Sequence, residues 1–239
     1  MTALETAHSN LNALRQNPYP GRGLVIGQSA SGSWLILYWI MGRSVQSRNR
    51  RFTVEGGSLR TESVDVRLVK DPSLIIYEAM LELPGIYIVS NGDQTRTIYQ
   101  ALQSGRTFEA ALSTREREPD APNFTPRISG ILDLRQSSSV ITLSILKANP
   151  LDAQHTDRFT YHPALPQMGF GVGLTTYRGD GNPLPSFSGD PVLLPFHGSA
   201  ERILDTYWEA LNPENRVSLA VKEIPAQEGM ARLLVYNRY

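Results

Sequence analysis

Residues 34–41 read Trp-Leu-Ile-Leu-Tyr-Trp-Ile-Met and form one of the most apolar segments of the chain. A short apolar run of this kind is typical of a strand that is buried on both faces. Residues 23–27 form a second apolar run, and a short segment with serine and glycine separates the two. Two strands around such a turn predict a β-hairpin.

Most of the remaining apolar positions also follow strand-like patterns. In residues 62–69 the apolar positions alternate with Asp65 and Arg67, which predicts a half-buried strand. The segments 155–162 and 170–177 are expected to form a further strand pair. Other strands are expected at 51–56, 73–80, 85–90, 127–135, 139–147, 216–223 and 230–237.

Helical spacing of apolar residues occurs in three parts of the chain. Residues 3–16 carry a stripe that includes Ala7 and Leu11, and the prolines that follow end this helix. A second helical region covers 94–115, and a third begins after Ser199, which is a good N-cap residue.

Because strands follow strands and helices come in clusters, the pattern favours antiparallel sheets with helices on their outer faces. Two such sheets packed face to face predict an α+β fold, a four-layer α/β/β/α sandwich of mainly antiparallel sheets. We expect an N-terminal helical extension at 1–20 and a single domain at 21–239.

Composition narrows the function. The chain has 239 residues, 23 basic and 23 acidic, and a net charge of zero, which argues against general nucleic-acid binding. It has no cysteine, which excludes a disulfide framework and thiolate metal sites, and its 4 histidines show no ligand spacing. No apolar run reaches the roughly 18 residues of a membrane span, so we expect a cytoplasmic protein without a membrane partner.

The segment 42–52 is the first candidate site, because it carries four arginines directly after the apolar run 34–41. A guanidinium group is a fixed fork of donors that keeps its charge, so arginines at a strand end suit an anion with several oxygens. Asn49 lies between Arg48 and Arg50, and no acidic run is close by in the sequence. A solvated basic loop is the alternative interpretation.

Other polar residues stand where apolar strands end or where the chain is irregular. Tyr77 and Glu78 interrupt one strand, and Asn91-Gly92 joins another to a helix start, where backbone amides are free. The proline-rich segment 115–127 adds three candidates: the carboxylate of Glu118, the amide of Asn123 and the guanidinium of Arg127. Tyrosine and glutamate can relay protons, and arginine can polarise a carbonyl group. A core tyrosine or a solvated charge run would explain each residue taken singly.

These residues fall in the order and spacing of a known family. Ser44 with Asn49-Arg50, Asp71-Pro72 with Tyr77, residues 89–92 with Thr95, residues 118–120, and residues 125–128 together resemble the archaeal-type IMP cyclohydrolases. The resemblance covers roughly residues 21–130 and is loose beyond them. It implies a fold like that of the Ntn hydrolases, without their N-terminal nucleophile. It also implies closure of 5-formamidoimidazole-4-carboxamide ribonucleotide to inosine monophosphate with loss of water, with no cofactor and no metal.

The resemblance also implies roles for individual residues. Arg50, Tyr77 and Glu118 fall on catalytic positions of the family. Glu78 stands where the family often has asparagine, and its charge beside a phosphorylated substrate would be unfavourable unless it points away. The resemblance places Asn49, Asn91, Gly92 and Arg127 around the purine nucleotide. Arg43, after the apolar strand, and Asn123, in the irregular segment, are expected there from their positions, and either Arg43 or Arg127 is expected to hold the 5′-phosphate.

Three other functions are open at this point. A nucleotide-binding protein without turnover is compatible with Glu78 and with the divergent second half of the chain. An amide hydrolase on the same scaffold is possible because fold alone does not decide chemistry. A nucleic-acid binder using residues 43–51 is the weakest of the three, given the zero net charge. A homo-oligomer is compatible with each reading.

Overall fold

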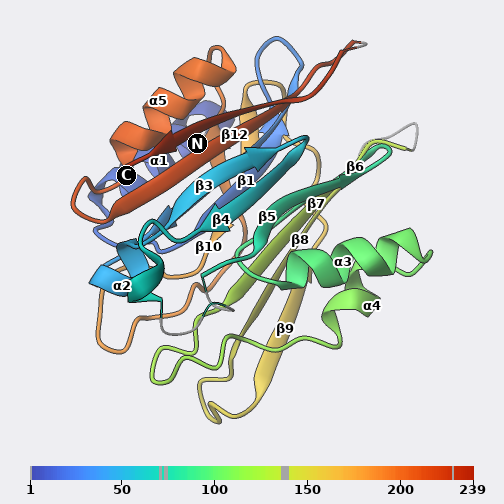
Figure 1. The fold of residues 1–239 in the computed structure, drawn as a ribbon. Helices are drawn as coiled ribbons and strands as arrows, with labels where there is room; N and C mark the ends of the chain where they lie inside the picture. Colours follow the sequence, from blue (N-terminus) through green and yellow to red (C-terminus); the bar gives the residue numbers. More distant parts are fainter. Residues whose placement is uncertain (1, 70–71, 73–74, 136–139, 228) are drawn as a thin grey trace.

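A computed structural model describes residues 2–69, 72, 75–135, 140–227 and 229–239, and it has an α+β fold with two mainly antiparallel sheets. Figure 1 shows the two sheets packed against each other, with both chain ends near helices α1 and α5. The first sheet has the order β11-β10-β1-β2-β12-β13, and the second runs from β3 through β4, β5, β6, β7 and β8 to β9.

The strands of the first sheet are β1 Gly23–Gln28, β2 Trp34–Met41, β10 Phe170–Thr175, β11 Val192–Pro195, β12 Arg216–Ile224 and β13 Arg232–Asn237. The strands of the second sheet are β3 Arg51–Glu55, β4 Ser58–Glu62, β5 Glu78–Leu83, β6 Ile86–Ser90, β7 Arg127–Asp133, β8 Val140–Ala148 and β9 Thr156–Tyr161. Every strand pair within the two sheets is antiparallel.

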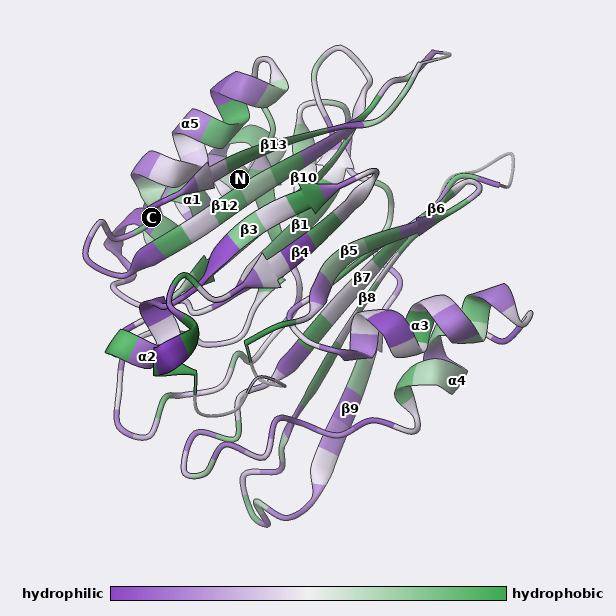
Figure 2. Ribbon diagram, in the orientation of Figure 1, coloured by the Kyte–Doolittle hydropathy of each residue, from purple (hydrophilic) through white to green (hydrophobic). Residues whose placement is uncertain are grey.

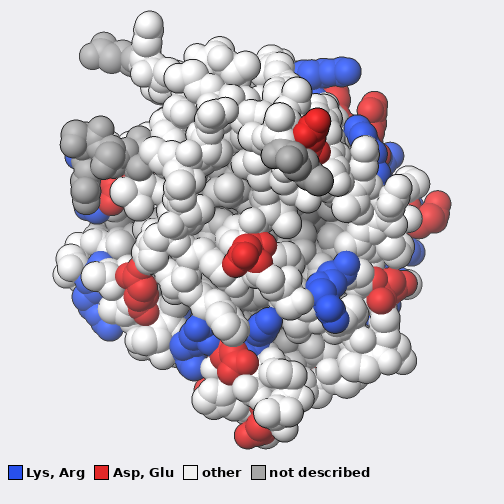
Figure 3. Space-filling view, turned by 180° about the vertical axis from the view of Figure 1, so that it is seen from behind, with Lys and Arg blue, Asp and Glu red and all other residues white. Residues whose placement is uncertain are grey.

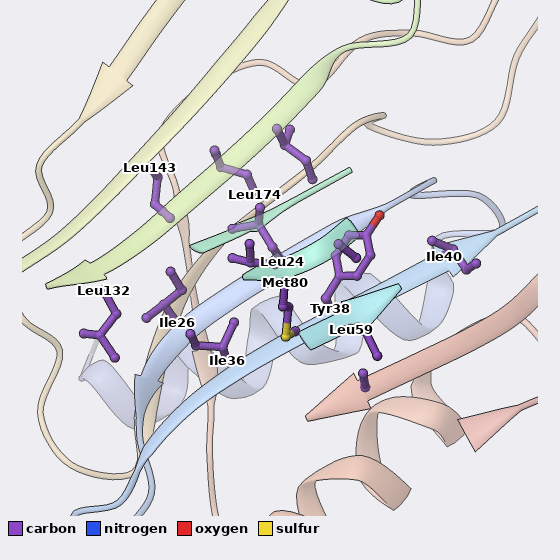
Figure 4. Packing of buried hydrophobic residues seen from close by; sticks show 14 of the residues in the cluster. Leu24, Ile26, Ile36, Tyr38, Ile40, Leu59, Met80, Leu132, Leu143 and Leu174 are labelled. Atoms are coloured by element: carbon purple, nitrogen blue, oxygen red, sulfur yellow. The ribbon is translucent and has the colours of Figure 1, made fainter. Parts of the chain in front are cut away.

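Strand β2 explains why residues 34–41 are apolar without interruption. Every residue of β2 is buried, as predicted. Its side chains alternate between two cores, because Ile36 and Tyr38 pack between the sheets whereas Leu37 and Trp39 pack on the opposite face. Figure 4 shows Met80 of the second sheet close to Ile36 and Tyr38, and Leu132 and Leu143 of the same sheet belong to the same cluster.

Helices cover the outer face of each sheet. Helix α1 (Ala3–Gln16) and helix α5 (Ala200–Ala210) bury their apolar residues in the core on the first sheet. Helix α3 (Gln94–Gln103) and helix α4 (Phe108–Leu112) do the same on the second sheet. Figure 2 shows the resulting distribution, with hydrophobic strands between amphipathic helices. The predicted hairpin and the three helical regions are confirmed.

Two strand predictions are wrong. Residues 62–69 contain only the end of β4, followed by a short 3-10 helix at Val66–Leu68. The alternation there has no neighbouring strand to bury it, so Val66 is 77% exposed and Asp65 instead caps the turn through the backbone amide of Arg67. The strands β9 and β10 exist, but β9 pairs with β8 and β10 pairs with β1, so they belong to different sheets.

Part of the predicted strand 73–80 and the first residue of the predicted strand 139–147 lie outside the described residues. Of the described residues in 73–80, only those from Glu78 onward belong to a strand, β5. Two short elements had no clear sequence signal: helix α2 (Val45–Arg48) and the edge strand β11. Among the described helices, none is long and apolar enough to cross a membrane. Basic and acidic side chains are interspersed on the face shown in Figure 3, which fits the zero net charge.

Candidate active site

A cavity of about 640 Å³ lies where the start of β1, the end of β2 and the irregular segment 115–127 come together. Its size is within the range of small-molecule sites. Its lining is rich in charged and hydroxyl-bearing side chains. The lining residues are Tyr19, Arg22, Arg43, Ser44, Gln46, Ser47, Arg50, Ile75, Glu118, Asp120, Asn123, Thr125, Tyr177 and Leu184.

Helix α2 determines where the arginines after β2 lie. Ser44 caps this helix by accepting a hydrogen bond from the Ser47 backbone amide at 3.1 Å. The turn brings Arg50 back toward the core, where it is 4% exposed and donates from Nε to the Ser47 carbonyl oxygen at 3.0 Å. The pKa of Arg50 is lowered because burial disfavours its charge and because Arg22 is a nearby cation.

A buried ion pair joins Arg22 to Glu118. Arg22 lies directly before β1, and its Nη2 is 3.4 Å from Oε2 of Glu118, with both side chains at most 10% exposed. Burial raises the pKa of Glu118, although Arg22 opposes that shift, so the carboxyl group retains a proton more readily than usual. Burial also acts to lower the pKa of Arg22, but Glu118 and the neighbouring tyrosines outweigh it and raise that pKa above its usual value.

The tyrosine expected at the site belongs to a buried pair. The hydroxyl groups of Tyr77 and Tyr38 are 2.7 Å apart, and both rings are at most 4% exposed. The backbone amide of Tyr77 donates to Thr61 Oγ1 at 3.0 Å, which fixes the ring at the start of β5. The pKa of Tyr38 is raised, first by burial and then by Tyr77. Tyr38 therefore remains protonated and can donate to Tyr77.

Tyr177, at the start of loop 177–191, lines the cavity itself. Tyr177 hydroxyl lies 2.6 Å from Thr125 Oγ1, and burial raises the pKa of this tyrosine far above its usual value. Thr125 also donates its backbone amide to Asp120 Oδ1 at 2.6 Å. These contacts hold the irregular segment against the loop. The backbone amide of Glu118 donates a hydrogen bond to the Thr125 carbonyl oxygen at 3.0 Å, so Glu118 is held in place together with this segment.

Loop 177–191 closes one side of the cavity. Arg43 forms an ion pair with Asp180, donates to the Gly181 carbonyl oxygen at 3.0 Å, and lies over the ring of Tyr19. On the other side, the Asn123 side-chain oxygen accepts a hydrogen bond from the Leu184 amide at 3.1 Å. Arg43 and Asn123 thus anchor the loop and line the cavity as well.

The residues after β6 form a separate cluster that does not line the cavity. The Asn91 side chain donates to the Pro126 carbonyl oxygen at 2.8 Å and accepts from the Ile128 amide at 2.8 Å. Arg127 binds Asp93 and Gln94 through Nη1, both at 2.7 Å. At Gly92 an added Cβ would lie 2.6 Å from Arg127 Nη1, so only glycine leaves room for that arginine.

Two further residues point away from the cavity. The Asn49 side-chain amide donates to the Asp65 carbonyl oxygen and accepts from the Asp65 amide, both at 2.7 Å. Asn49 therefore holds the segment that follows β4. Glu78 forms an ion pair with Arg96 of α3 and is absent from the cavity lining. Its charge therefore does not face the cavity.

The structure thus brings together four of the nine predicted site residues at the cavity: Arg43, Arg50, Glu118 and Asn123. Tyr77 adjoins them through its electrostatic contact with Arg22 and Arg50, whereas Asn49, Asn91, Gly92 and Arg127 bond to other parts of the chain.

Sequence reasoning missed Arg22, Tyr38 and Tyr177. Arg22 had a usable signal, because it is a lone charge between two glycines directly before a buried strand. Within the described residues, no group of three His, Asp or Glu side chains is placed to hold a metal ion.

Comparison with known proteins agrees with the resemblance seen in the sequence. The model of the family described as IMP cyclohydrolase-like protein matches residues 19–228. A protein named IMP cyclohydrolase from Methanothrix thermoacetophila is 31% identical over 122 residues, which is 50% of this chain and 60% of that relative. The match therefore spans less than two thirds of the relative's length. The family match extends over most of the chain, and the protein belongs to the IMP cyclohydrolase-like family.

Proposed function

We propose that this protein is an IMP cyclohydrolase that closes 5-formamidoimidazole-4-carboxamide ribonucleotide to inosine monophosphate with loss of water. The observation that carries the proposal is the cavity in which the buried Arg22, Arg50 and Glu118 meet, in a chain of this family. The cavity offers cations for a phosphorylated substrate and a carboxyl group for proton transfer. The name of the archaeal relative supports the same reaction.

The reaction requires a poor nucleophile to attack a poor electrophile. The carboxamide nitrogen forms a bond to the formyl carbon, and the formyl oxygen becomes an alkoxide. One proton leaves the attacking nitrogen and one leaves the formamido nitrogen, and both depart with the formyl oxygen as water. Holding the two groups in contact supplies much of the rate increase, because the enzyme bears the entropy cost on binding.

In this mechanism Arg50 stabilises the oxyanion on the formyl oxygen. Glu118 protonates the departing hydroxyl, a role suited to a carboxyl group whose pKa is raised by burial. Tyr77 relays the proton of the attacking nitrogen to the formyl oxygen, giving up its own hydroxyl proton as it accepts the new one, and the Tyr38 hydroxyl lies 2.7 Å away, placed to donate to it. The carboxylate left on Glu118 then takes the proton of the formamido nitrogen, so that both groups end as they began. Arg22 orients Glu118 through the buried ion pair.

For the nucleotide we propose that Arg43, at the more open side of the cavity, binds the 5′-phosphate, and that Asn123 lies beside the ribose. Arg43 is partly exposed and paired with Asp180, a bond that an incoming phosphate can replace. Asn49, Asn91, Gly92 and Arg127 are proposed to act indirectly, by holding the segments that surround the cavity. We also propose that the two sheets with helices outside them form the Ntn-hydrolase-like four-layer sandwich.

The decisive experiment is a direct assay of the purified chain with the formamido ribonucleotide, following the appearance of inosine monophosphate. A blank without protein is essential, because ring closures of this kind also proceed slowly in solution. Tyr77→Phe and Glu118→Gln should each lower kcat by roughly 10²-fold, the usual size of a lost acid or base. Tyr87→Phe is the matched control, because this partly buried tyrosine lies outside the cavity lining.

Three outcomes separate the alternatives. Turnover that depends on Tyr77 and Glu118 supports the cyclohydrolase. No turnover above the blank, with inosine monophosphate still raising the melting temperature, leaves a nucleotide-binding protein and overturns the enzyme proposal. Release of free formate from the substrate without ring closure would instead indicate an amide hydrolase.

A further inference from the structure

A second cavity, of about 430 Å³, lies between helix α1 and the strands β1, β10 and β11. It is separate from the arginine-lined cavity, and among the described residues the two walls have only Tyr177 in common. Its wall is largely apolar and includes Leu14, Trp39 and Phe187. A volume of this size suits a small ligand with a flat apolar body.

The charge in the described wall of this cavity is positive only. Among the described residues that line it, Arg178 is the only charged one, and no carboxylate accompanies it. The Arg178 side chain makes no ion pair within the described part of the chain, in contrast to Arg43 next to the other cavity. An unpaired guanidinium at the edge of an apolar cavity favours an anionic ligand group.

A second cation, Lys147, lies close to this cavity. Lys147 donates to the carbonyl oxygen of Phe187, a lining residue, at 2.9 Å. The pKa of Lys147 is lowered because burial disfavours its charge and because Arg178 adds repulsion, while Asp157 opposes both effects. The two cations are therefore close enough to repel each other. A bound anion would relieve that repulsion.

The wall also contains an unsatisfied donor. Trp39 is 1% exposed, and its indole Nε1 has no hydrogen-bond partner in the described structure. The ring lies across Gly23, where an added Cβ would be only 2.0 Å from it. A buried donor without a partner destabilises a protein by about 1–3 kcal/mol. An acceptor atom of a ligand, inserted after a small shift of the wall, would satisfy this nitrogen.

From these observations we propose that the cavity beneath α1 is a binding site for a small aromatic or apolar monoanion, such as an aromatic carboxylate. The apolar body lies among Leu14, Trp39 and Phe187, and the anionic group meets Arg178. The site does not depend on the activity proposed above. Because Tyr177 belongs to both walls, occupancy is expected to be felt at Thr125, to which the Tyr177 hydroxyl is bonded.

Isothermal titration calorimetry of the full chain with 2-naphthoate tests the proposal. Binding is expected with a dissociation constant below roughly 1 mM, and naphthalene-2-methanol, which lacks the charge, should bind at least about 10-fold more weakly. Arg178→Gln should reduce the affinity for 2-naphthoate about 10-fold. Trp39→Phe, which keeps a ring but removes the N–H group, should reduce it roughly 3- to 10-fold.

Steric variants test the location. Ala13→Trp changes an exposed position of α1 that lines the cavity, so it should block the cavity without disturbing the fold, and affinity should fall at least about 10-fold. Asn12→Trp, at the preceding position of α1, is the matched control, because Asn12 is exposed and does not line the cavity. Arg202→Gln, at an exposed position of α5, is the control for charge. Both controls should bind 2-naphthoate like the parent chain.

The outcomes are decisive in both directions. The proposal stands if 2-naphthoate binds and Arg178→Gln and Ala13→Trp both weaken it while the controls do not. It is overturned if 2-naphthoate fails to bind at about 1 mM, if the neutral analogue binds equally well, or if Ala13→Trp leaves the affinity unchanged.

Discussion

Two arginine–carboxylate pairs, Arg22 with Glu118 and Arg127 with Asp93, differ in what surrounds them. Glu118 pairs with Arg22 at the cavity and has a side chain that is 4% exposed. Asp93 pairs with Arg127 away from the cavity, and its side chain is 49% exposed. In each arginine, Nε is buried and has no partner within the described structure.

The two carboxyl groups are shifted in opposite directions. Burial raises the pKa of Glu118 against the effect of Arg22. For Asp93 burial acts in the same direction, but Arg127 and Arg115 together lower its pKa. Asp93 is thus held as an anion, which suits a structural ion pair. Glu118 is closer to losing or gaining a proton, which suits catalysis. The direction of the pKa shift of the partner carboxyl group therefore distinguishes an arginine in a structural ion pair from one in a catalytic pair.

The largest expected effect comes from Arg22→Met, which removes the buried partner of Glu118. Loss of one member of a buried pair typically destabilises a protein by about 3–5 kcal/mol. The pKa of Glu118 should rise further, because Arg22 is the main group that opposes burial. Urea unfolding monitored by circular dichroism measures the stability, and turnover should fall in parallel.

Arg22→Lys is the informative companion variant, because it keeps the charge but loses the guanidinium geometry. If Arg22 only balances charge, the lysine variant should recover both stability and turnover. Recovery of stability without recovery of turnover would place Arg22 in the orientation of Glu118. A stability unchanged in Arg22→Met would contradict the importance of the pair.

Arg50→Ala should act mainly on catalysis. Loss of one oxyanion donor usually lowers kcat by about 10²- to 10³-fold, which corresponds to about 2.7–4 kcal/mol. Steady-state kinetics with the formamido ribonucleotide check this, with Arg51→Ala as the control because Arg51 is exposed and does not line the cavity. A rise in KM with an unchanged kcat would instead make Arg50 a uniform binding group.

Arg127→Met should show the opposite profile. Asp93 and Gln94 would lose their shared donor, so a stability loss of about 1–3 kcal/mol is expected. The kcat value should stay within about 10-fold of the parent chain, because Arg127 does not touch the cavity. Arg135→Met, which removes a 54% exposed arginine side chain paired with Asp133, is the control for loss of an arginine. A large rise in KM in Arg127→Met would move the phosphate site to this cluster.

The sequence predicts the strands better than their partners. Residues 34–41 are correctly predicted as buried on both faces, because a continuous apolar run leaves no polar face. Strands β9 and β10 were also found, but their alternation carries no information about which sheet each one joins. At residues 62–69 the alternation is present but no neighbouring strand covers it, so the chain turns instead.

At the site, too, the sequence predicts which residues matter better than it predicts what they contact. Arg50 was predicted because it follows a buried strand and matches a family pattern, and Glu118, in the irregular segment, was predicted because it matches the same pattern. Asn49 and Asn91 match that pattern equally well, yet their amides bond to the backbone of Asp65 and Ile128. Residue type does not reveal which hydrogen bonds a side chain makes. Tyr38 had no signal, since a tyrosine in an apolar strand is ordinarily a core residue.

The smallest expected effect is a dependence of stability on pH that distinguishes the two carboxyl groups. The folded-state pKa of Glu118 is raised, so the folded protein binds this proton more tightly than the unfolded chain. This contribution is fully present below the usual pKa of 4.5 and is lost as pH rises through the raised value. The folded-state pKa of Asp93 is lowered, so its contribution is present above the usual 3.8 and is lost on acidification.

Unfolding free energies of the parent chain, Glu118→Gln and Asp93→Asn at several pH values from about 3 to 8 test these signs. Glutamine imitates the protonated Glu118, so the parent should lose stability relative to Glu118→Gln as pH rises above 4.5. Asparagine lacks the charge that Arg127 and Arg115 bind, so the parent should lose its advantage over Asp93→Asn as pH falls below 3.8. Equal slopes for the two variants would mean that the carboxyl groups share one environment, and the contrast between the pairs would then fail.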